Sequence, residues 1–202
     1  MIEDLVKAVN IPVSVKMRLG FYDDEDLITT AKNFESSGIA SLAIHGRTTL
    51  QKFKGQAAWE KIYEVKENIS IPVIGNGDIT SAKIGVNKIK NLDGIMIGRQ
   101  AVKNPWIFKQ CRELFDGKEM SEKPSLNDQM ALFEKHAELA IAFKDERWAM
   151  IEMRKHFSHF IRGIHGATGY RERLIRVESH GKMKAIFDEI RKEQSIFSNA
   201  PE

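Results

Sequence analysis

The sequence predicts an α/β fold, the C-terminal half of a (β/α)8 TIM barrel over residues 1–120, followed by an all-helical domain over residues 121–202. Two observations lead to this prediction. In the first part, four short apolar runs alternate with amphipathic helical patterns, and their starts lie about 23 to 30 residues apart. The second part keeps the helical pattern but has no such runs. Apolar strands that alternate with helices are typical of a parallel sheet covered by helices.

The apolar runs are the predicted strands, at residues 11–17, 41–46, 71–77 and 94–98. Apolar positions at helical spacing follow the first three strands, and Thr80 is a suitable N-cap for the third of these helices. Four βα units make up half of the eight that close a barrel. A small open parallel sheet fits the same periodicity equally well.

The second part begins after a stretch rich in Lys, Glu and Pro at residues 117–124. Ser125 is placed to cap the next helix, and apolar stripes continue to about residue 190. No strand pattern interrupts them, so this part is predicted to be all helical.

Composition narrows the class of protein. Of the 202 residues, 42% are hydrophobic and 29% are charged, as in a soluble globular protein. No apolar run approaches the ~20 residues of a membrane span, and the acidic start does not resemble a signal peptide. Cys111 is the single cysteine, which excludes an internal disulfide and a cysteine-rich zinc site. We therefore expect a cytoplasmic protein without membrane partners and without a metal site.

Polar side chains end each predicted strand, at the edge where barrel enzymes carry their chemistry. In chain order they are Lys16, Arg18, His45, Asn76, Asp78 and Arg99. An ammonium group among apolar neighbours needs an anionic partner if it points inward, although Lys16 could instead point outward to solvent. A lone histidine in such a place is more often structural than functional.

Glycines bracket the end of the third strand in "IPVIGNGDI". Gly75 and Gly77 would let the backbone approach a ligand closely, and N–H groups before a helix suit a phosphate. Gly98 and Arg99 repeat this arrangement after the fourth strand. Tight turns use the same residues, but two successive strand ends of this kind predict a phosphorylated ligand across the strand tips.

Positive charge gathers in the helical part. Residues 147–184 contain nine Lys or Arg and three Asp or Glu, a net charge of +6 in a chain whose total is +3. Such a cluster is typical of binding to a nucleic-acid backbone, although a solvated helix face would look the same. The predicted RNA contacts in this part are Arg154, Lys155, Arg162, Arg171, Arg173 and Arg176.

Five motifs occur in an order and spacing that resemble one family, the tRNA-dihydrouridine synthases. They are "PVSVKMRLG", "IHGRT", "IPVIGNGDI", "DGIMIGR" and "NPWIF". The resemblance implies an enzyme with flavin mononucleotide (FMN) that reduces uridine in tRNA, with NADPH as the reductant. It also implies that Lys16 and His45 contact the flavin ring. Arg47 could contact either flavin or RNA, and we predict a contact with RNA. The resemblance further implies that the ribityl chain and phosphate of FMN are held by Asn76, Gly77, Asp78, Gly98 and Arg99.

The chain departs from this family in length, because members run to roughly three hundred residues and start with four strands that are not seen here. The family's catalytic cysteine lies among those strands, and Cys111 is predicted to be a packed structural residue instead. We therefore expect this chain to be inactive alone, to bind flavin weakly, and to form dimers or oligomers through exposed sheet edges.

Two other functions fit parts of the pattern. One is a different FMN-dependent barrel oxidoreductase that acts on a small metabolite. The other is a tRNA-binding module with a vestigial half-barrel, which flavin binding would distinguish from the enzyme.

Overall fold

The computed structural model describes residues 1–160 and 164–198, and the side chains at 158–160 and 195–198 lie outside this description. The chain divides into two compact units, Met1–Ser121 and Glu122–Glu202. We call them the sheet unit and the helical unit, and each is described by itself.

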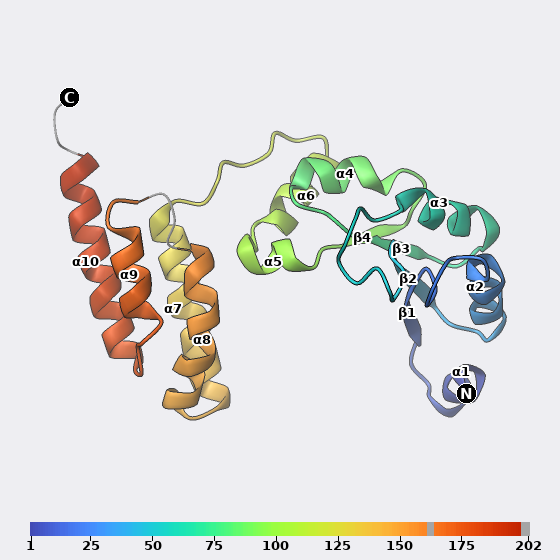
Figure 1. Cartoon of the computed structure of the whole chain (residues 1–202), viewed down its shortest axis with the longest axis horizontal. Coiled ribbons are helices and arrows are strands. Elements are labelled where there is room, and N and C mark those ends of the chain that lie inside the picture. Colours follow the sequence, from blue (N-terminus) through green and yellow to red (C-terminus); the bar gives the residue numbers. More distant parts are fainter. Residues whose placement is uncertain (161–163, 199–202) are drawn as a thin grey trace. The chain divides into compact units, whose positions relative to one another are not determined.

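The sheet unit contains four parallel strands, which lie in the sheet in the order of the sequence (Figure 1). They are β1 (Ser14–Arg18), β2 (Ser41–His45), β3 (Val73–Asn76) and β4 (Gly94–Met96). The helices of this unit are α1 (Ile2–Ala8), α2 (Leu27–Ser36), α3 (Trp59–Asn68), α4 (Ala82–Ile89), α5 (Arg99–Lys103) and α6 (Ile107–Phe115). The α/β class is thus confirmed, and the sheet is consistent with part of a TIM barrel. Closure of a barrel and pairing of sheet edges between copies stay predictions.

The register assigns the side chains of the strands to two faces, since successive residues of a strand point to opposite sides. Ile44 lies beside Met17 and Gly75 on the face that carries the core of the unit. A Cβ atom on Gly75 would overlap the ring of Trp59, so glycine at this position lets α3 pack directly on β3. The other face carries the last residues of the strands, including His45 and Asn76.

The helix after β3 begins one residue later than predicted. Ser81, not Thr80, is the N-cap of α4, and its hydroxyl accepts a hydrogen bond from the N–H of Ile84 at 3.3 Å. Both residue types are good caps, and the extended backbone at Ser81 decides between them.

The helical unit contains four helices in its described part (Figure 1). They are α7 (Leu126–Phe143), α8 (Glu146–Phe160), α9 (Ala167–Leu174) and α10 (His180–Ser198). Ser125 caps α7 as predicted, in a reciprocal capping box with Asp128. The rings of Phe133, Phe157 and Phe187 meet in the core, with centroids 5.1 to 6.5 Å apart. Among the residues that the structure describes, no helix is both long and apolar enough to cross a membrane.

Candidate functional site

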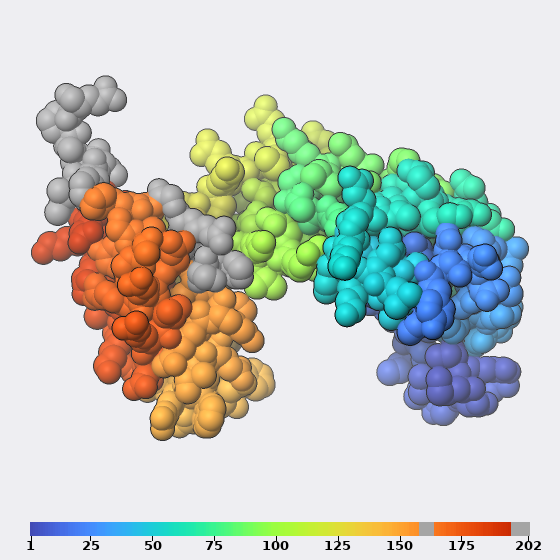
Figure 2. Space-filling view, in the orientation of Figure 1, coloured from blue at the N-terminus to red at the C-terminus, as the bar shows by residue number. Residues whose placement is uncertain are grey.

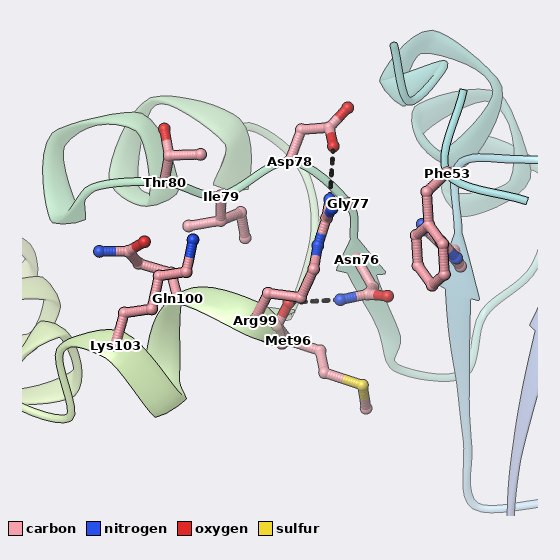
Figure 3. Close-up of a pocket in the computed structure, with 12 residues that line it drawn as sticks. Phe53, Asn76, Gly77, Asp78, Ile79, Thr80, Met96, Arg99, Gln100 and Lys103 are labelled. Carbon is pink, nitrogen blue, oxygen red and sulfur yellow. Dashed lines mark hydrogen bonds and ion pairs between the residues drawn. The ribbon is translucent and has the colours of Figure 1, made fainter. Parts of the chain in front are cut away.

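A pocket of about 250 Å³ opens at the carboxyl ends of the strands in the sheet unit (Figure 3). His45, Asn76 and Met96 lie in one row of the sheet, so their side chains meet on the same face. The full lining is His45, Phe53, Asn76, Gly77, Asp78, Ile79, Thr80, Met96, Gly98, Arg99, Gln100 and Lys103. Six of the seven predicted cofactor-binding residues therefore lie around one cavity.

Lys16 is the seventh, and it does not line the pocket. It is exposed, two residues before the end of β1, and pairs in register with Ala43. The alternation of β2 places Ala43 and His45 on one face, so Lys16 lies on the face that carries His45. Its side chain is solvent-accessible.

The turn between β3 and α4 needs its glycine. Gly77 has φ of +137°, and a Cβ atom there would lie 2.5 Å from the Cβ of Ala57. Its carbonyl accepts a hydrogen bond from the indole N–H of Trp59 at 3.0 Å. Asp78 follows with φ of +51°, a left-handed conformation that aspartate tolerates better than most residues. The turn therefore presents backbone at the pocket and holds Asp78 in a fixed direction.

Arg47 is buried, with 2% of its side chain exposed, which contradicts the prediction that it contacts RNA. Its guanidinium donates to both carboxylate oxygens of Asp78, at 2.9 and 2.7 Å, and to the carbonyls of Lys54 and Gly55. These contacts leave no exposed edge for an RNA phosphate. Arg47 instead ties the β2–α3 loop to the end of β3.

Asp78 is ionised in this environment. Burial raises the pKa of its carboxyl group, but the hydrogen bonds from Arg47 and from the N–H of Ala57, together with the charges of Arg47 and Arg99, lower the pKa below its usual range. Both oxygens are occupied by these donors. Asp78 therefore organises the site and leaves little capacity to accept hydrogen bonds from a ligand.

His45 is a neutral imidazole near pH 7. Its burial lowers its pKa, and the positive charges of Arg18, Lys16 and Arg47 lower the pKa further, against a weaker opposite effect of Asp78. The ring lies beside Gly77, with Cδ2 3.4 Å from the position that a Cβ atom would take there. A neutral ring can both donate and accept a hydrogen bond.

Arg99 is an exposed cation of the pocket, with 66% of its side chain accessible. Its guanidinium approaches Asp78 at 3.5 Å and lies 5.0 Å from the ring centre of Phe53. Figure 3 shows Arg99 directed toward Asp78, with the ring of Phe53 at the right of the view. Asn76 donates its amide N–H to the Met96 carbonyl at 2.7 Å, which fixes the amide in place.

Sequence reasoning missed Phe53 and Lys103. Phe53 belongs to the β2–α3 loop, whose residues appear in cyan at the surface in Figure 2, and 62% of its surface is exposed. A single aromatic residue in a basic loop belongs to no sequence pattern that would indicate which site its ring joins. Lys103 stands four residues after Arg99, one helical turn on, and this spacing could have identified it.

The predicted RNA contacts of the helical unit differ in their exposure and in the partners they already have. Arg154 donates to the Val177 carbonyl at 2.8 and 3.0 Å, and Arg173 forms a two-pronged pair with Glu189 at 2.6 and 2.8 Å. Both guanidinium groups are thus already engaged within the protein. Lys155 and Arg176 are exposed, Arg171 is half-buried and donates to Thr168, and Arg162 lies outside the described residues.

Two further features bear on chemistry. Cys111 is packed as predicted, with burial raising the pKa of its thiol. Among residues 1–160 and 164–198, no group of three or more His, Cys, Asp or Glu side chains could hold a metal ion.

Comparisons with known proteins identify the family. A family model described as "Dihydrouridine synthase (Dus)" matches residues 1–199. A probable tRNA-dihydrouridine synthase of Rickettsia conorii is 38% identical over 173 residues, which cover 84% of this chain and 52% of the relative. The tRNA-dihydrouridine synthase B of Pasteurella multocida is 37% identical, over 83% of this chain and 52% of the relative.

The chain spans about half the length of these curated relatives. A solved structure of mandelate oxidase matches with a TM-score of 0.37 at 11% identity, over 96% of this chain and 60% of that chain. The family match and the curated relatives agree, and this chain belongs to the dihydrouridine synthase family.

Proposed function

We propose that this chain supplies the FMN-binding and tRNA-binding portion of an oxidoreductase that reduces uridine to dihydrouridine in tRNA, with NADPH as reductant, in the cytoplasm. The single observation that carries the proposal is the pocket at the strand ends, where Arg99 and Lys103 face a cavity lined by Asn76 and by the backbone at Gly77 and Gly98.

The donor set fits FMN. Two cations and backbone N–H groups at a glycine-rich turn suit a phosphate, and the N-terminus of α4 adds positive potential beside Thr80. The neutral imidazole of His45 can hydrogen-bond to the polar edge of a ring. Flavin supplies hydride transfer when it is bound. The ammonium group of Lys16 would stabilise negative charge at the pyrimidine end of the ring.

FMN binding tests the proposal, because free FMN fluoresces and a bound flavin is commonly quenched. We expect the chain to quench FMN, and Arg99→Gln to weaken the affinity about tenfold, as loss of a charge-assisted hydrogen bond implies. Arg112→Gln removes another exposed arginine of the same unit, which does not line this pocket, and should leave the affinity unchanged. Equal effects of the two substitutions would contradict phosphate binding at Arg99.

Binding of tRNA tests the second half of the proposal. Lys155 and Arg176 are exposed cations in the basic cluster, so Lys155→Gln and Arg176→Gln should each weaken tRNA binding. Each should also reduce the slope of log affinity against log salt by about 1, as expected when one phosphate contact is lost. Lys135→Gln, on α7 and outside the cluster, serves as the control for total charge. If Lys135→Gln reduced the salt slope as much as Lys155→Gln or Arg176→Gln does, that result would contradict a defined RNA surface.

A further inference from the structure

The carboxylate of Asp78 lies between two arginines, which hold it very differently. Arg47 reaches both oxygens with a two-pronged contact at 2.9 and 2.7 Å and is buried. Arg99 reaches one oxygen at 3.5 Å and is mostly exposed. A third donor, the N–H of Ala57, lies 2.8 Å from Oδ2. The short contacts thus all come from the buried side, and the exposed arginine is only loosely attached.

This unequal sharing matters because a carboxylate can neutralise a guanidinium and compete with an anionic ligand for it. If Asp78 lacked its buried partner, Arg99 would be the nearest cation to its free charge. The two groups would then form a direct pair at the pocket wall, and an anion would have to break that pair in order to bind.

Arg47 also fixes the loop that carries Phe53. Its Nε donates to the Lys54 carbonyl at 3.1 Å, and its Nη2 donates to the Gly55 carbonyl at 2.6 Å. Phe53 directly precedes these residues, and its ring lies 5.0 Å from the Cζ atom of Arg99. Contacts of this kind attract a guanidinium to the face of the ring. Arg47 therefore influences Arg99 from two directions, through Asp78 and through Phe53.

We propose that Arg47 is a positioning residue which, by occupying the Asp78 carboxylate, keeps Arg99 free to bind the anionic part of a ligand. The inference rests on the proposed function only in taking the phosphate of FMN as that anion. It assigns Asp78 a role in controlling the charge of Arg99, in place of direct contact with the ligand.

Rescue by a second substitution tests the proposal. We expect Arg47→Met to weaken FMN affinity about tenfold, the effect of losing one charge-assisted hydrogen bond. Adding Asp78→Asn should restore most of the affinity, since the amide is uncharged and cannot neutralise Arg99. Arg47→Lys should retain most of the affinity, because its ammonium still pairs with Asp78, and this variant serves if Arg47→Met does not fold.

Lys66→Met is the matched control. Lys66 is a half-buried cation that pairs with Asp93 at 2.8 Å, away from the pocket. It should lower stability without changing FMN affinity. If Arg47 merely supported the fold, the double variant would bind no better than Arg47→Met, and that result would overturn the proposal.

A second measurement needs no ligand. In the wild-type background, Arg99→Gln should leave the urea midpoint nearly unchanged, because Arg99 is only loosely paired. In the Arg47→Met background, Arg99→Gln should lower the midpoint, because Asp78 has then turned to Arg99. If Arg99→Gln shifted the urea midpoint equally in both backgrounds, the inference would be refuted, whether or not the wild-type chain quenches FMN. Absence of FMN quenching by itself would count against the proposed function instead.

Discussion

Trp59→Ala is expected to destabilise the sheet unit by about 3–5 kcal/mol, the usual range for removing a buried aromatic side chain. Trp59 is buried against β3, where its ring fills the space left open by Gly75, and its indole N–H binds the Gly77 carbonyl. The substitution would open a cavity under the strand and leave that carbonyl without its partner. Urea unfolding followed by circular dichroism measures the loss.

Trp148→Ala is the control for this change. Trp148 is 63% exposed, so its removal should alter the free energy of unfolding by less than about 0.5 kcal/mol. Trp59→Phe should cost less than Trp59→Ala, because it keeps an aromatic ring but loses the N–H donor. If the free energy of unfolding of Trp59→Ala were close to that of the wild type, α3 would not support the glycine turn.

Phe157→Ala should produce a comparable loss in the helical unit, about 3–5 kcal/mol. Phe157 is fully buried and stacks on Phe133 at 5.1 Å, with Phe187 at 6.5 Å. Such a loss is a large share of the 5–15 kcal/mol that stabilises a typical domain. We expect the variant to lose tRNA binding at 37 °C and to keep FMN quenching, because each unit has its own core.

Phe143→Ala tests whether burial is the cause, because this phenylalanine of the same unit is 88% exposed. It should leave both unfolding and tRNA binding near the wild-type values. Loss of FMN quenching in Phe157→Ala would contradict independent folding of the two units. Thermal unfolding by circular dichroism, run alongside both binding measurements, separates these outcomes.

The sequence predicted the strands and the gathering of their polar ends for a physical reason. Apolar runs must be buried, and parallel strands bring their carboxyl ends to one edge, so His45, Asn76 and Arg99 meet regardless of loop detail. Arg47 could not be placed in this way. Its partner Asp78 is 31 residues away, and nothing local shows that the guanidinium turns inward. Thr80 and Ser81 are chemically similar caps, and only the backbone conformation separates them.

The order of the strands has a consequence for how such a sheet can change in evolution. Each strand pairs only with its neighbours along the chain, so no strand is inserted between two earlier ones. A duplicated βα unit could therefore be added beside β1 or β4 without breaking any hydrogen bond of the existing ladder. Growth of this kind leaves the pairing of the older strands intact at every step.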